Sequence, residues 1–193
     1  VSEKFAKDNG LDYTPEQVVI SCGGKHSIFN IISVLCQEGD EVIIPAPYWV
    51  SYPEMVKAVG AVPVVVSGKE GNDFKITPDQ LKDVITANTK LIILNSPSNP
   101  TGAVYTKNEL EQLGSVLVDK DIAILTDDIY EKMLYTEEPF VNIAMAVPEL
   151  KNRVFVAHGV AKTSSMTGWR IGFAAGPMDA MTGLARFHSN TTA

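Results

Sequence analysis

Short apolar runs alternate with longer amphipathic stretches along the whole chain. The runs that predict β-strands are Val18–Ile20, Val42–Ile44, Val62–Val66, Leu91–Leu94, Ile122–Leu125, Val154–Val156 and Trp169–Ala175. Most of them lack polar residues at alternate positions, which is typical of strands covered on both faces. The stretches between them have helical periodicity. The pattern predicts an α/β fold, in which a mostly parallel sheet carries helices on both faces in three layers.

Local signals mark several element boundaries. Capping boxes at Thr77–Gln80 and Thr106–Glu109 each predict the start of a helix. Pro45, together with Pro47, predicts the end of the second strand. Pro63 predicts that the third strand starts irregularly or lies at a sheet edge.

Composition narrows the class of protein. The chain has 193 residues, about the size of one domain, and its 45% hydrophobic and 20% charged residues are ordinary for a globular protein. A net charge of −7 without a basic run argues against nucleic-acid binding. No apolar stretch approaches the roughly 18 residues of a membrane span. Two cysteines are too few for a disulfide framework.

The two ends of the chain predict that it belongs to a longer protein. It starts at Val1 with a helix-like stretch and without a secretion signal, and it stops at Ala193 without a closing element. We therefore expect an inner segment of a cytoplasmic protein.

Polar clusters follow four of the predicted strands. They are Gly23–Ser27, Asn95–Gly102, Asp127–Tyr130 and His158–Ser164. Ligands bind beyond the carboxyl ends of parallel strands, so these clusters predict one site at one edge of the sheet.

Each cluster also has a purely structural interpretation. The glycine pair can be a tight turn, the Asn-Pro-Thr-Gly segment a solvated turn, the aspartate a helix cap, and Trp49 a core residue. Neither nucleotide-binding glycine fingerprint is present. The combination is more informative than its parts, because a lysine, an aspartate, a glycine turn and an aromatic ring at one edge are what a pyridoxal phosphate enzyme requires.

The motifs carry a resemblance to a known family. Ala161–Gly172 (AKTSSMTGWRIG) is the strongest match, and Asn95–Gly102, Asp127–Tyr130 and Pro47–Pro53 follow the same order. Over essentially its whole length the chain resembles the fold-type I pyridoxal phosphate-dependent aminotransferases, most closely the bacterial aspartate aminotransferases. The resemblance implies that residues 1–193 are the cofactor-binding large domain, truncated at both ends and lacking the small C-terminal domain.

The resemblance implies catalytic roles for three residues. Lys162 would form the Schiff base with pyridoxal 5′-phosphate and move the substrate proton. Asp127 would pair with the ring nitrogen, and Tyr130 would bind the ring phenolate oxygen together with Asn99. Donors to that oxygen stabilise its negative charge.

The remaining cofactor contacts are also implied by the resemblance. Trp49 would stack on the ring, and Arg170 would bind the phosphate with the backbone of Gly24 and Lys25. The family often has a hydroxyl residue in place of Lys25, so one phosphate contact is expected to be missing.

The implied activity is transamination between an amino acid, with aspartate favoured, and a 2-oxo acid, with 2-oxoglutarate favoured. The alternatives are another fold-type I enzyme such as a β-lyase, the ligand-sensing domain of an aminotransferase-like transcription regulator, and a nucleotide-binding α/β domain. The resemblance further implies a homodimer whose substrate-carboxylate arginine lies beyond this chain, so these residues alone are expected to be poorly active. No metal role is expected for His26, His158 or His188, whose spacing does not suit a chelate.

Overall fold

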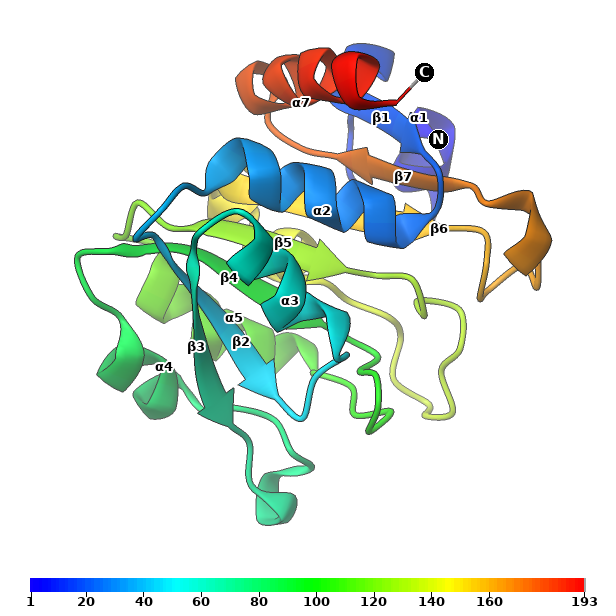
Figure 1. The fold of residues 1–193 in the computed structure, drawn as a ribbon. Coiled ribbons are helices and arrows are strands. Elements are labelled where there is room, and N and C mark those ends of the chain that lie inside the picture. Colours follow the sequence, from blue (N-terminus) through cyan, green and yellow to red (C-terminus); the bar gives the residue numbers. More distant parts are fainter. Residues whose placement is uncertain (193) are drawn as a thin grey trace.

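Seven strands, one for each predicted apolar run, form a single sheet (Figure 1). The computed structural model describes residues 1–192. The strands are β1 (Val18–Ser21), β2 (Glu41–Ala46), β3 (Val62–Ser67), β4 (Thr89–Asn95), β5 (Ala123–Asp127), β6 (Val154–Gly159) and β7 (Gly172–Ala175). Their order across the sheet is β1-β7-β6-β5-β4-β2-β3. The predicted fold class is confirmed.

The strand directions place most carboxyl ends on one edge. Strands β3, β2, β4, β5 and β6 are parallel, whereas β7 is antiparallel to both of its neighbours. Strand β1 therefore runs in the direction of β6. As a result, the segments that follow six strands and the segment that precedes β7 meet at the same edge of the sheet.

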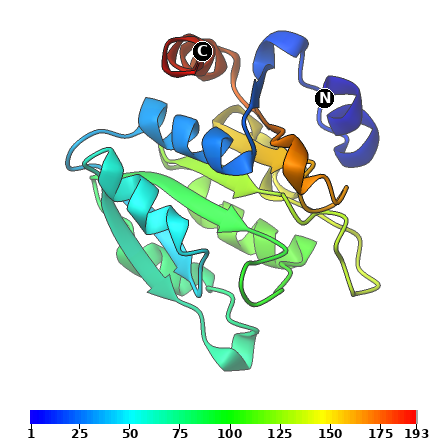
Figure 2. The same ribbon diagram turned by 45° about the vertical axis from the view of Figure 1, so that its right-hand side comes forward.

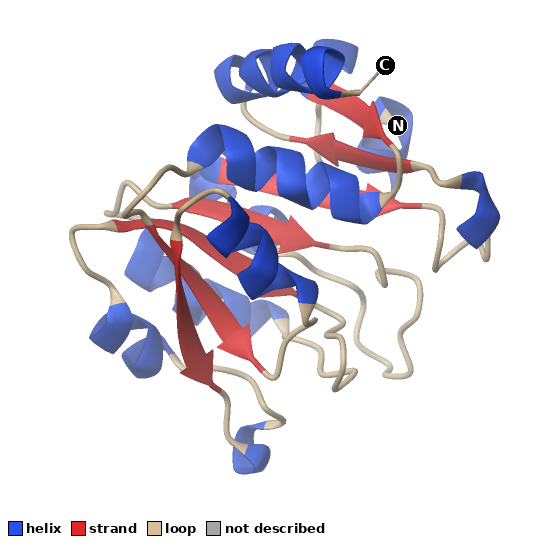
Figure 3. Ribbon diagram, viewed as in Figure 1, coloured by secondary structure: helices blue, strands red, loops and turns tan. Residues whose placement is uncertain are grey.

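Helices cover both faces of this sheet (Figure 3). The helices are α1 (Ser2–Lys4), α2 (Gly24–Leu35), α3 (Ser51–Ala58), α4 (Pro78–Val84), α5 (Lys107–Leu117), α6 (Ile143–Ala146) and α7 (Met178–Thr191). One core cluster lies under α2, α3 and α7, with Ile28, Tyr52 and Leu184 among its members. The other cluster joins α4, α5 and α6 with the N-terminal segment through residues such as Phe5 and Leu110. The chain is thus a three-layer structure, and α7 lies near the N-terminal part of the chain at one end of the sheet (Figure 2).

Both predicted capping boxes form. The hydroxyl of Thr77 accepts the N–H of Gln80 at 3.3 Å, and the hydroxyl of Thr106 accepts the N–H of Glu109 at the same distance. Each bond satisfies one of the free N–H groups of a helix start. Pro63 lies in β3, which is an edge strand as predicted. None of the helices described between residues 1 and 192 is both long and apolar enough to cross a membrane.

Several strand boundaries differ from the predicted ones; β6, for example, continues to Gly159. Two of the differences concern prolines or a turn. Strand β2 continues through Pro45 to Ala46, because its pairing with β4 ends at Ile43 and only the β3 side remains paired. Strand β7 begins at Gly172 rather than Trp169. The residues before it form a short 3-10 turn and then reach Arg170, whose φ of 54° is left-handed and incompatible with a strand.

Candidate functional site

The carboxyl edge of the sheet contains a cavity of about 220 Å³. All eight residues proposed from the sequence as site residues line it, namely Gly24, Lys25, Trp49, Asn99, Asp127, Tyr130, Lys162 and Arg170. They come from segments that are far apart in sequence, and the strand directions bring those segments together.

Asp127 supplies a buried carboxylate at one side of the cavity. It is the last residue of β5 and is only 5% exposed. The hydroxyl of Tyr52 donates to its Oδ2 at 2.6 Å, and the N–H of Ile129 donates to its Oδ1 at 3.3 Å. Burial raises the pKa of Asp127, while these two hydrogen bonds and the nearby His158 act in the opposite direction. The carboxylate is thus held in one orientation and desolvated, which favours a positively charged partner.

Asn95 fixes the backbone around this carboxylate. Its side-chain amide donates to the carbonyl of Asp127 at 2.9 Å, and its Oδ1 accepts the N–H of Asn99 at 2.7 Å. Asn95 therefore joins the loops that follow β4 and β5. Sequence reasoning missed both Asn95 and Tyr52, although each lies inside a segment that carried the resemblance.

A glycine turn and Arg170 form the opposite side of the cavity. Helix α2 begins at Gly24, so the first N–H groups of the helix have no carbonyl partner within it and its positive end faces the cavity. Gly23 has a φ of +88°, and a Cβ at this position would lie 2.7 Å from Nη2 of Arg170. A side chain there would displace the guanidinium. The arrangement is suited to binding an anion such as a phosphate.

The approach of Arg170 to this turn depends on β7. Ser21 pairs with Gly172 in the antiparallel β1–β7 ladder. A Cβ on Gly172 would lie only 2.2 Å from the carbonyl carbon of Gly23, so glycine is required for the two backbones to meet. Nη1 of Arg170 also donates to the carbonyl of Thr167 at 3.1 Å.

Lys162 brings a primary amine to the same cavity. It is exposed, and its Nζ lies 5.9 Å from the centre of the Tyr130 ring. The neighbouring Thr163 hydroxyl donates to the carbonyl of Ile129 at 3.1 Å, which ties the lysine loop to the loop that carries Tyr130.

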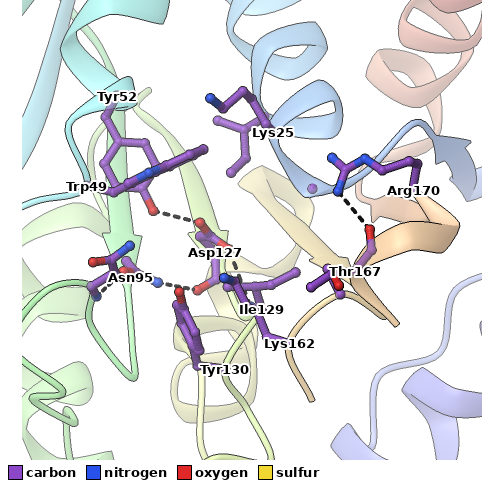
Figure 4. Close-up of a pocket in the computed structure, with 14 residues that line it drawn as sticks. Lys25, Trp49, Tyr52, Asn95, Asp127, Ile129, Tyr130, Lys162, Thr167 and Arg170 are labelled. Atoms are coloured by element: carbon purple, nitrogen blue, oxygen red, sulfur yellow. Dashed lines mark hydrogen bonds between the residues drawn. The ribbon is translucent and has the colours of Figure 1, made fainter. Parts of the chain in front are cut away.

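Two aromatic side chains lie close to one another beside α2. The rings of Trp49 and Tyr52 meet edge to face, with centroids 5.4 Å apart. Nζ of Lys25 lies 4.9 Å from the Trp49 ring. Figure 4 shows Asn95, Asp127 and Tyr130 on one side of the cavity and Arg170 on the other. One cavity therefore combines a buried carboxylate, an anion-binding end, an aromatic ring and an amine.

The histidines lie outside this cavity. His158 is buried, with its Nε2 3.2 Å from Glu131 and its ring stacked on Phe173. The rings of His26 and His188 are 5.0 Å apart. Over residues 1–192 no cluster of three or more His, Cys, Asp or Glu side chains is arranged to hold a metal ion.

Comparison with protein families identifies the family to which this chain belongs. The family model "Aminotransferase class I and II" matches residues 1–193. The chain belongs to this family. Class I and II aminotransferases are an enzyme family, and membership in it favours the aminotransferase interpretation over a nucleotide-binding α/β domain.

Individual aminotransferases match at substantial identity. The chain is 53% identical over 192 residues to an aspartate aminotransferase of Geobacillus stearothermophilus, and 48% identical over 192 residues to that of Bacillus subtilis. It covers 49% of each of these proteins, and each alignment covers 100% of the chain. The chain thus spans about half the length of its relatives.

Solved aminotransferase structures share the fold. An aspartate aminotransferase from Rhizobium meliloti is 39% identical, with a TM-score of 0.97 over 100% of this chain and 48% of that one. An aspartate aminotransferase from Thermus thermophilus with maleate is 41% identical, with a TM-score of 0.94 over 99% of this chain and 49% of the other.

Proposed function

We propose that the protein containing this chain transfers amino groups between aspartate and 2-oxoglutarate with pyridoxal 5′-phosphate bound in the cavity. The single observation that carries the proposal is the convergence of all eight expected site residues on one cavity. Residues 1–193 would be the cofactor-binding large domain. A small domain would complete the site, and a second subunit would form the dimer.

The residues present fit this cofactor. The buried Asp127 carboxylate suits a protonated ring nitrogen, because each charge lowers the cost of burying the other. At the other end, Arg170 fills the space left by the absent side chain of Gly23, beside the start of α2, which suits a phosphate. The two ends differ in charge sign, so they would bind the cofactor in one orientation.

When bound, the cofactor supplies an aldehyde that bonds to primary amines and a ring that withdraws electrons from the substrate. Lys162 would supply the amine for attachment, and its Nζ would hold and move the proton at the substrate α-carbon. The carboxylate of Asp127 would keep the ring nitrogen protonated. Tyr130 and Asn99 would donate hydrogen bonds to the ring oxygen. Trp49 would cover one ring face and exclude water.

Aspartate is favoured as substrate by the relatives. The most similar of those named above are aspartate aminotransferases, and the Thermus protein is described with maleate, a four-carbon dicarboxylate like aspartate. A relative from Nitrosomonas europaea, 46% identical, is named aspartate/prephenate aminotransferase. Prephenate is therefore the second amino acceptor to test.

The proposal is tested by trapping the cofactor on the intact protein. After loading with pyridoxal phosphate and reduction with borohydride, mass spectrometry of the peptides should find the added mass on Lys162. A separate sample of the loaded protein that has not been reduced should convert aspartate and 2-oxoglutarate to oxaloacetate and glutamate. A trapped cofactor on another lysine, or no oxaloacetate from aspartate, would contradict the proposal.

Tyr52→Phe should change the pH dependence of this reaction. The hydrogen bond from Tyr52 stabilises the Asp127 carboxylate, so its loss lets the pKa of Asp127 rise. A carboxyl with a higher pKa takes up its proton at higher pH as the solution is acidified. The acid limb of the kcat/KM profile should therefore move to higher pH, by roughly one unit.

Tyr48→Phe is the matched control for this change. It removes a hydroxyl four residues earlier, in the segment that precedes α3, and should leave the acid limb in place. An unshifted profile in the Tyr52 variant would show that this hydroxyl does not govern the state of Asp127.

A further inference from the structure

A buried cluster of charged side chains lies behind the cavity, on the opposite face of the sheet. Side chains alternate along β5 and β6, so Leu125 and Ala157 join the core under α2, while Ile124 and Val156 join the core under α5. By this alternation Asp127 faces the cavity and His158 faces the other way. The cluster is therefore separated from the cavity by the sheet itself.

Glu131 is at the centre of this cluster and is only 3% exposed. Its Oε2 accepts the ammonium of Lys4 at 2.6 Å and the side-chain amide of Asn9 at 3.2 Å. Its Oε1 lies 3.2 Å from Nε2 of His158, close enough for a strong electrostatic contact although not well aligned for a hydrogen bond. The contacts to His158 and Lys4 lower the pKa of Glu131 to about 2.

His158 is oriented by its own backbone. Its Nδ1 contacts the backbone of Gly159, 2.6 Å from the amide nitrogen and 3.1 Å from the carbonyl oxygen, and its Nε2 faces Glu131. Its ring stacks on Phe173 at 5.0 Å. The nearby His158 also acts to lower the pKa of Asp127 across the sheet, against the effect of burial.

Glu131 also closes the turn that carries Tyr130. The N–H of Glu131 donates to the carbonyl of Asp128 at 2.9 Å, and Tyr130 is the third residue of that turn. The carboxylate of Asp128, held by Thr126 and Asn142, secures the other end of the turn. Tyr13 is a further titratable group nearby, and burial together with the charge of Asp128 raises its pKa to about 12.

The N-terminal segment is docked by apolar contacts as well as by charge. Phe5 is fully buried, and its ring lies 5.4 Å from Tyr13 and 5.8 Å from Phe173. Lys4 precedes Phe5 in sequence, so the apolar contacts of Phe5 help to hold the Lys4 ammonium at Glu131.

We propose that Lys4, Glu131 and His158 form a positioning assembly that holds the Asp127–Tyr130 loop in place and sets the charge felt at the cavity. The inference rests on the proposed function for its link to the cofactor. The three residues act through Asp127 and Tyr130 and do not themselves touch the reacting groups.

Charge substitutions in the intact protein distinguish this role from a structural one. Lys4→Met and Glu131→Gln break the same contact but remove charges of opposite sign. The visible absorption band of the bound cofactor should titrate at higher pH in the Lys4 variant and at lower pH in the Glu131 variant. Each shift should be a few tenths of a pH unit.

Lys132→Met is the matched control. Lys132 also contacts the N-terminal segment, through Asp8 at 3.0 Å, but its side chain is exposed, so removing its charge should leave the band in place.

Hydrogen exchange of the cofactor-free protein provides the second measurement. Amides of residues 128–133 should exchange about tenfold faster in the Lys4 and Glu131 variants than in the wild type and the Lys132 variant. Equal exchange in all four proteins, or band shifts of the same sign in the two test variants, would overturn the proposal. A wild-type protein that binds no cofactor would instead contradict the proposed function, and the exchange result would still decide the positioning role.

Discussion

Replacing Lys162 with alanine is expected to abolish the borohydride-trapped cofactor and to lower kcat for transamination by about 10⁴-fold, the upper end of what a positioned proton-transfer group contributes. Lys162 is exposed at the cavity and is tied to the Tyr130 loop through Thr163, so the substitution removes an amine without opening the core. Peptide mass spectrometry and a coupled assay for oxaloacetate provide the measurement.

The control for this prediction is a second lysine of the same cavity. Lys25→Ala removes an ammonium that lies against Trp49 but leaves Lys162 in place. The trapped adduct should therefore persist in the Lys25 variant and disappear in the Lys162 variant. Persistence of an adduct in both variants would assign the covalent role to a different residue.

Asp127→Asn is expected to lower kcat by about 10²- to 10³-fold, the range seen when one preorganised electrostatic group is lost. The carboxylate is buried and aligned by Tyr52 and Ile129, so it is poised to pair with a cation at a fixed position. An amide of the same shape keeps the packing but cannot stabilise a protonated ring nitrogen. The loss should appear mainly in kcat, with a smaller change in cofactor affinity.

Asp128→Asn is the matched control, because it removes an equally buried carboxylate one residue away on the other face of the sheet. Its pKa is raised to about 6 by burial, and its partners are Thr126 and Asn142 rather than the cavity. Its effect on kcat should be far smaller than that of Asp127→Asn. Equal losses in the two variants would mean that the loop, and not the charge at position 127, is what matters.

The elements of the fold followed closely from local sequence. Continuous apolar runs such as Leu91–Leu94 predicted buried strands, and the capping boxes at Thr77 and Thr106 predicted helix starts, because both signals are local and physically specific. The boundary at Trp169 was wrong because Thr167–Trp169 form a 3-10 turn and Arg170 adopts a left-handed backbone, neither of which has a clear signal in the local apolar pattern.

The candidate site was predicted as a set of residues but not as a geometry. Each of its motifs directly follows a strand or precedes β7, so parallel strand order was enough to predict one edge. The bond from Tyr52 to Asp127 joins residues 75 positions apart, and that from Lys4 to Glu131 joins residues 127 positions apart. Neither contact has a local signature.

The sequence by itself determined the elements, the three-layer class and the edge of the sheet where the site lies, because apolar periodicity, capping and strand-end motifs act over a few residues. Only the tertiary structure decided how the site residues face one another. The antiparallel insertion of β7 brings Arg170 to the start of α2, and burial on opposite faces of β5 separates Asp127 from the Glu131 cluster. These relations arise from the packing of distant segments, which no local pattern encodes.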